Sequence, residues 1–299
     1  MKLFTKVFLI FILTITITSG CASDKTEADN RLTVAVSIVP QETFVKAVAG
    51  EIVNVVTMIP PGQSPETYSP SPQVMRQLSS ASVYFAIGVP VEKSYILPWA
   101  AELNKNMEIV HLEEAVRQIH GLRYFDEEHG HSDEEGYDPH IWLSPKRVKT
   151  MIDEISKVLS KMDPENEETY KENAESYKSQ LDKLDEEIRN IFSDATNKTF
   201  IINHPSLGYF ADDYGLEMIS LEEEGKEATA RDLQEKINFA REHGIKTVFY
   251  QAEAGSKQAR AFAENIGGEA RMLEPLSPDY IDNLRRIAEA IVIPGGKTE

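Results

Sequence analysis

Short apolar runs alternate with amphipathic helical patterns along the chain from residue 32 onward. Short apolar runs are typical of buried strands, and apolar positions at helical spacing are typical of helices that face a core. The runs that predict strands are 32–36, 52–58, 83–87, 199–202, 217–221, 247–250 and 270–273. Helical patterns include 71–80, 232–243, 257–266 and 278–293. Strands that alternate with helices predict an α/β fold with mainly parallel sheets.

The middle of the chain carries two long helical patterns. Ser144 and Pro145 begin the first, because a capping side chain followed by proline is a helix start signal. Asp163 and Pro164 begin the second in the same way. Residues 164–193 would make about 45 Å of helix, with one apolar face and one face rich in Glu and Lys. Since this helix lies between two α/β halves, we interpret it as a rigid connection rather than a free coiled-coil arm.

The predicted fold is therefore α/β, with two lobes that have mainly parallel sheets and are joined by a long rigid helix. We expect an N-terminal lobe over 32–163, a connecting helix over 164–194 and a C-terminal lobe over 195–299. A length of 299 residues suits one large domain or two ordinary ones. With 41% hydrophobic and 27% charged residues, the composition excludes a disordered, collagen-like or multi-span membrane chain.

The net charge of the chain limits the classes of partner that it is expected to bind. Asp and Glu number 49 against 31 Lys and Arg, which gives a formal net charge of −18. Such a chain repels the phosphate backbone, so a nucleic-acid partner is not expected, whereas cations are tolerated. The single cysteine, Cys21, excludes a disulfide framework and a thiolate metal cluster.

The N-terminus has the pattern of an export segment. Residues 1–20 have a short basic start, an apolar stretch too short for a comfortable membrane span, and small residues before Cys21. The Ser-Gly-Cys sequence ending at Cys21 resembles a lipobox, although Thr18 stands where an aliphatic residue is usual. We predict a signal peptide over 1–20, lipidation of Cys21 and a polar tether over 21–31. Ordinary secretion with an incidental cysteine is the alternative.

Four side chains with metal-binding or catalytic potential lie where ligands are expected in α/β sheets, beyond the carboxyl ends of strands or at helix starts. They are Glu66, His140, His204 and Asp279. Two come from each half of the chain, so we expect them to converge on a cleft between the lobes. Two imidazoles with two carboxylates suit Zn²⁺, Mn²⁺ or Fe²⁺.

Each candidate also has an ordinary structural interpretation. Glu66 could be a solvent-facing loop carboxylate, His140 a hydrogen-bonded core histidine and His204 a loop histidine that caps the next helix. Asp279 could simply favour a helix N-terminus. The spacing is not diagnostic, because the sequence contains no HExxH, paired CxxC, GxxxxGK[ST] or GxSxG motif. The acidic segment 126–136, with His129 and His131, reads as a surface loop that attracts divalent cations or is merely solvated.

Several segments match a known family in order. The most specific is Asp-Pro-His-Ile-Trp-Leu-Ser-Pro at 138–145, and 62–68, 204–210, 256–257 and 273–276 also match. On these segments the chain resembles the metal-binding family of ABC-transporter substrate-binding proteins, which serve zinc and manganese uptake. The resemblance covers about residues 32–293. It implies two α/β lobes joined by one long helix, with the metal site in the cleft between them.

The resemblance also implies a ligand set. His140 matches the family's second metal histidine, and Asp279 matches the fourth ligand, a carboxylate. His204 matches the third ligand, which is His in zinc-type members and usually Glu in manganese-type members. The first ligand is normally His, but Glu66 occupies that position here. His204 and the loop histidines favour zinc, whereas Glu66 favours a harder ion or a site that has lost its metal.

We therefore expect an extracytoplasmic binding protein, anchored to the membrane through Cys21, that captures a divalent transition metal. Zinc is favoured over manganese or iron, and the partners implied are an ABC permease and its ATPase, with the protein itself a monomer. Two other functions stay open at this point. One is a metal-dependent hydrolase with a general base from 222–224 or Glu253, although we do not expect an enzyme. The other is a surface adhesin.

Overall fold

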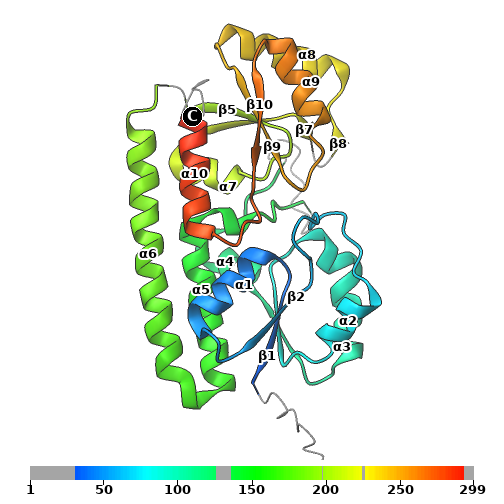
Figure 1. The fold of residues 1–299 in the computed structure, drawn as a ribbon, viewed down its shortest axis with the longest axis vertical. Helices are drawn as coiled ribbons and strands as arrows, with labels where there is room; N and C mark the ends of the chain where they lie inside the picture. The colour runs from blue at the N-terminus through cyan, green and yellow to red at the C-terminus, as the bar shows by residue number, and fades with distance from the viewer. Residues whose placement is uncertain (1–30, 126–135, 197, 224–225, 293–299) are drawn as a thin grey trace, which may run out of the picture. The chain divides into compact units, whose positions relative to one another are not determined.

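The structure is a computed structural model that describes residues 31–125, 136–196, 198–223 and 226–292 (Figure 1). The predicted signal peptide, Cys21, and the tether up to residue 30 lie outside the described residues. His129 and His131 also lie outside them. Within the described residues, none of the helices combines the length and the apolar character that crossing a bilayer requires.

The N-terminal lobe is built on a parallel four-stranded sheet in the order β2-β1-β3-β4. Its central strands β1 and β3 are almost completely buried, as expected for a parallel sheet covered on both faces. The strands are β1 (Thr33–Val36), β2 (Asn54–Thr57), β3 (Val83–Ala86) and β4 (Glu108–His111). The helices are α1 (Val39–Ala49), α2 (Pro72–Leu78), the π-helix η1 (Glu92–Ile96), α3 (Leu97–Leu103) and α4 (Leu112–His120).

The C-terminal lobe repeats this architecture with a parallel sheet in the order β10-β9-β5-β6. A two-stranded antiparallel ribbon, β7 with β8, follows β6. The strands are β5 (Thr199–Ile202), β6 (Glu217–Ser220), β7 (Glu222–Glu223), β8 (Lys226–Glu227), β9 (Thr247–Gln251) and β10 (Glu269–Leu273). The helices are α7 (Gly208–Tyr214), α8 (Ala230–Glu242), α9 (Lys257–Ile266) and α10 (Tyr280–Val292).

Two long helices follow the N-terminal sheet, and the second of them links the lobes. The turn η2 (Ile141–Leu143) leads into α5 (Pro145–Met162), and the turn η3 (Pro164–Asn166) leads into α6 (Glu167–Ser193). The Ser144 side chain accepts a hydrogen bond from the Arg147 amide and so caps α5. Helix α6 runs beside both sheets, contacting α1 in one lobe and α7 and α10 in the other (Figure 1). The predicted fold class, two α/β lobes linked by a long helix, is confirmed.

The largest buried apolar cluster is shared by the two lobes. It extends from Val34 and Phe85 in the first sheet, through Leu181 on α6, to Phe249 on β9 and Leu284 on α10. A smaller cluster fills the outer part of the C-terminal lobe, under α8 and α9. Because burial of apolar area is the main favourable term in folding, the shared cluster favours a fixed arrangement of the lobes.

Candidate metal centre

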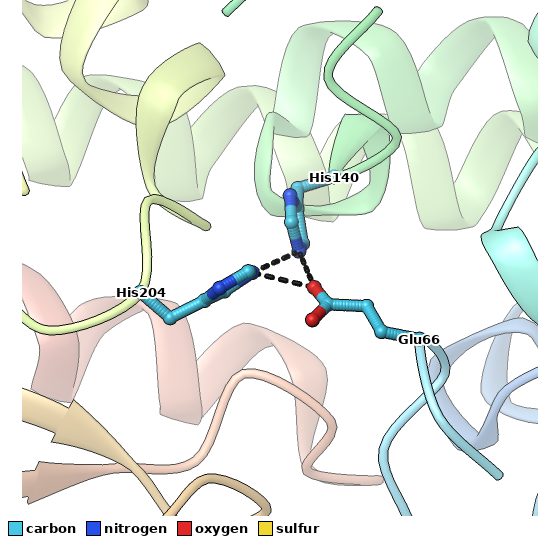
Figure 2. Close-up of side chains that lie close together, drawn as sticks. All are labelled: Glu66, His140 and His204. Carbon is cyan, nitrogen blue, oxygen red and sulfur yellow. Dashed lines mark hydrogen bonds and ion pairs between the residues drawn. The ribbon is translucent and has the colours of Figure 1, made fainter. Parts of the chain in front are cut away.

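Three side chains from distant parts of the sequence converge on one point (Figure 2). Glu66 lies in the loop after β2, His140 directly precedes η2, and His204 follows the end of β5. Glu66 Oε1 is 2.6 Å from His204 Nε2 and 3.7 Å from His140 Nε2. The two Nε2 atoms are 3.4 Å apart.

This triangle of atoms has the dimensions of a transition-metal site. One ligand atom from each residue lies within 4.8 Å of the other two. An ion about 2 Å from each of the three atoms, the usual zinc–ligand distance, fits between them. The imidazoles are almost fully buried, with 4% and 8% side-chain exposure for His140 and His204, whereas Glu66 keeps 30%. The site is therefore deep, and its carboxylate faces the water.

A buried carboxylate fixes the ring of His140. Asp138 is fully buried, and its Oδ1 lies 2.7 Å from His140 Nδ1 and accepts a 3.0 Å hydrogen bond from the His140 amide. The Arg123 guanidinium lies 3.5 Å from the other oxygen, Asp138 Oδ2. Because Nδ1 is engaged by Asp138, Nε2 is left to face the centre as a lone-pair donor. Such carboxylate–histidine pairs orient metal-binding imidazoles.

His204 is held in the same way from the other lobe. Its Nδ1 lies 3.0 Å from Oε2 of Glu222, the first residue of β7. The Asn203 side-chain amide donates a 2.7 Å hydrogen bond to Glu222 Oε1, which orients the carboxylate in turn. Both imidazoles therefore direct Nε2 at the same point, because a carboxylate holds the Nδ1 atom of each ring.

Glu66 and His204 hold each other in their charged forms. Burial lowers the pKa of His204, but its hydrogen bonds to Glu222 and Glu66 outweigh burial and raise that pKa to about 9. Burial raises the pKa of Glu66, but the hydrogen bond and charge of His204, together with His140, bring it below its ordinary value. A cation bound at this point would take the place of the His204 proton as the partner of the Glu66 carboxylate.

We expect the zinc-free protein to lose stability as the pH rises from about 6.5 to about 9. A histidine with a raised pKa contributes stability that is complete below its unfolded pKa and is lost as the pH passes its folded pKa. The rise in the pKa of His204 from 6.5 to about 9 corresponds to about 3 kcal/mol of unfolding free energy. Thermal unfolding with a chelator present, at intervals across this range, measures the effect. The same pH slope in His204→Asn would show that His204 is not its source.

Asp279, the fourth predicted ligand, lies outside the group of three. It is exposed directly before α10, where its amide donates to Ser277 Oγ and its carbonyl accepts from the Asn283 amide. These contacts suit a residue at a helix start, the ordinary structural interpretation of an aspartate in this place. A role of Asp279 as a metal ligand stays a prediction.

The sequence pattern did not identify the two carboxylates that hold the imidazoles. Asp138 stands two residues before His140 and begins the most specific motif. That motif therefore contained a signal for the role of Asp138. Glu222 was considered only as a general base for hydrolysis. In the structure its carboxylate bonds to Asn203 and to Nδ1 of His204, the ring nitrogen that does not face Glu66.

Hydrogen bonds between the lobes surround the His140 segment. The Trp142 indole donates to the Pro275 carbonyl at 3.0 Å, and the Tyr280 hydroxyl donates to the Trp142 carbonyl at 2.7 Å. On α7, the Tyr209 hydroxyl donates to the Asp138 carbonyl at 2.9 Å. The segment that carries His140 is therefore attached to the C-terminal lobe at several buried points.

Comparison with known families agrees with this geometry. Residues 34–293 match the family described as zinc-uptake complex component A, periplasmic (ZnuA). The chain belongs to this family. The resemblance to metal-binding substrate-binding proteins is thus confirmed, and the ZnuA family is one of transport components rather than of enzymes.

Individual ZnuA relatives show how far the similarity extends. The zinc-binding protein AdcA of Streptococcus pyogenes is 29% identical over 272 residues, covering 83% of this chain and 51% of AdcA. This chain spans about half the length of that relative. The high-affinity zinc uptake system protein ZnuA of Bacillus subtilis is 27% identical, with 91% of each chain covered. A ZnuA deletion mutant solved with zinc bound is 32% identical, with a TM-score of 0.79, covering 90% of this chain and 100% of that one.

Proposed function

We propose that this chain is an extracytoplasmic substrate-binding protein that captures Zn²⁺ as cargo and delivers it to an ABC-type membrane permease. The observation that carries the proposal is the convergence of His140 Nε2, His204 Nε2 and Glu66 Oε1 on one point. Each imidazole is oriented by its own carboxylate, so the donors are arranged for a cation before it arrives. We propose that lipidated Cys21 keeps the protein at the membrane beside the permease and its ATPase.

The donor set favours zinc among the divalent metals. Two imidazole nitrogens and one carboxylate oxygen suit a borderline-soft ion better than Mg²⁺ or Ca²⁺, which prefer oxygen donors. The three ligands that converge among the described residues leave a fourth coordination position open, whereas a structural zinc site is closed by four protein ligands. The names of the AdcA and ZnuA relatives, which specify zinc, support the same choice. Glu66 makes manganese or iron the alternative cargo, because a carboxylate is the harder ligand.

Metal content after competition tests the proposal. The chain from residue 22 is stripped with a chelator and dialysed anaerobically against equimolar Zn²⁺, Mn²⁺ and Fe²⁺, and elemental analysis follows. We expect one zinc ion per chain. Manganese or iron in its place would mean that Glu66 has changed the selectivity of the site. Retention of none of the three metals would contradict the proposal.

Replacing Glu66 with histidine should strengthen zinc binding, on the order of tenfold, and weaken manganese binding. The substitution exchanges the hard oxygen donor for a third imidazole, which suits zinc better than manganese. Titration of both variants against a chromophoric chelator measures the two affinities. Zinc and manganese affinities that are both unchanged would remove Glu66 from the ligand set.

A further inference from the structure

A second carboxylate, outside the metal centre, is completely buried in the N-terminal lobe. Glu92, the first residue of η1, has no exposed surface. Its Oε1 accepts from the Ile87 amide at 2.9 Å and from the Ser37 hydroxyl, and its Oε2 accepts from the Gly88 amide at 2.7 Å. A carboxylate taken out of water is destabilising unless it is well hydrogen-bonded. The partners of Glu92 directly follow the two strands β1 and β3.

Ser37, one of these partners, and Val91, the residue before Glu92, hold the loop that carries Glu66. Where the loop leaves β2, the Ile59 amide donates to the Ser37 carbonyl at 2.9 Å. Directly before Glu66, the Pro65 carbonyl accepts a 3.1 Å hydrogen bond from the amide of Val91, the neighbour of Glu92. Both attachments of the loop therefore lead to Glu92, one through Ser37 and one through η1.

The turn that Glu92 holds is closely packed at Gly88. Gly88 has a φ of 90°, and a Cβ there would lie 2.3 Å from the Tyr137 hydroxyl. A side chain therefore does not fit at position 88, and the amides of Ile87 and Gly88 both donate to Glu92. Loss of an acceptor at Glu92 leaves a buried amide unsatisfied, and η1 must move to correct it.

We propose that Glu92 is a positioning residue for metal binding, which sets the place of Glu66 through Ser37, the 87–88 turn and the Val91–Pro65 hydrogen bond. The inference rests on the proposed function, because it concerns affinity for the cargo ion. Glu92 itself does not touch the metal. Its effect on affinity therefore depends on the presence of the Glu66 carboxylate, which a purely structural role would not require.

A double-mutant cycle tests this dependence. Glu92→Gln keeps the shape of the side chain but replaces one acceptor oxygen with an amide nitrogen. Zinc affinity, by competition with a chelator, and the melting temperature of the zinc-free protein are measured for the unaltered protein, Glu92→Gln, Glu66→Ala and the double variant. We expect Glu92→Gln to weaken zinc binding about tenfold, as the loss of an outer metal-site partner does. In the Glu66→Ala background it should have no further effect.

Two further variants keep the test decisive. Ser37→Ala removes one hydrogen bond to Glu92 and leaves the turn intact, so it should give a smaller loss of affinity that again needs Glu66. Asp163→Asn is the matched control, because Asp163 also accepts side-chain hydrogen bonds, from Asn166 and Tyr170, but it lies after the C-terminal end of α5, away from the 87–88 turn. It should leave zinc affinity unchanged.

The outcomes separate this inference from the proposed function. The inference would be overturned if Glu92→Gln weakened zinc binding equally with and without the Glu66 carboxylate. It would also be overturned if neither Glu92→Gln nor Ser37→Ala weakened zinc binding. In both cases zinc binding by the unaltered protein would leave the proposed function standing. Failure of the unaltered protein to bind zinc would overturn both.

Discussion

Replacing His140 with alanine should abolish zinc retention. The substitution removes one of three converging donors and leaves Asp138 with a carboxylate that no longer orients an imidazole. Loss of an outer partner of a metal ligand typically reduces affinity about 10–100-fold, and loss of the ligand itself should exceed this. Elemental analysis after dialysis should find one zinc per chain in the unaltered protein and almost none in His140→Ala.

The control for this experiment is His243→Ala. His243 is exposed after α8, and its Nδ1 contacts the Phe239 carbonyl of its own helix. The variant carries the same chemical change and should keep its zinc. Equal zinc content in the two variants would show that the metal is bound elsewhere. Zinc should also raise the melting temperature of the unaltered protein and of His243→Ala, but not that of His140→Ala.

Replacing Asp213 with alanine should lower the free energy of unfolding by about 3–5 kcal/mol, the range for breaking a buried ion pair. Asp213 on α7 receives bonds from Arg147 Nη1 at 2.9 and 3.0 Å and from the Ser144 hydroxyl at 2.5 Å. The side chains of Arg147 and Asp213 are only about a tenth exposed. Without Asp213, the guanidinium remains buried without its counter-charge, and the start of α5 loses an attachment to the C-terminal lobe.

The neighbouring aspartate supplies the comparison. Asp212 also pairs with an arginine, Arg123, at 3.2 Å, but its side chain is 55% exposed. Exposed ion pairs contribute about 0–1 kcal/mol, so Asp212→Ala should be nearly neutral. Urea unfolding of the zinc-free proteins measures both changes. If the two substitutions cost the same, burial is not what makes the Asp213 pair stabilising.

Most of the strands could be predicted from the sequence because parallel strands are buried on both faces. The apolar runs at 83–87 and 199–202 correspond to β3 and β5 within one residue at either end. Strand β4, Glu108–His111, was missed. It lies at the edge of its sheet and is only partly buried, so its sequence needs just two apolar residues and carries little strand signal. The predicted domain boundaries at 163 and 195 stay predictions.

Prediction of the site was limited in a different way. Glu66, His140 and His204 could be named because they follow strands or precede a helix in recognisable segments. The carboxylate partner of His204 could not be named in this way, since Glu222 meets His204 only after β5, β6 and β7 are folded. Such proximity depends on tertiary structure and leaves no local pattern. Asp279 was named because it precedes a helix and matches the family's fourth ligand, and the structure describes it at that helix start, outside the group of three.

The unequal exposure of the three ligands has a kinetic consequence. A hydrated cation that approaches the site meets the Glu66 carboxylate, which is 30% exposed, before it reaches the nearly buried imidazoles. It can exchange its water molecules in steps, first for an oxygen at the entrance and then for the two nitrogens behind it. If the proposed function holds, we expect substitutions at Glu66 to change mainly the rate of zinc capture, and substitutions at the histidines to change mainly the rate of zinc release.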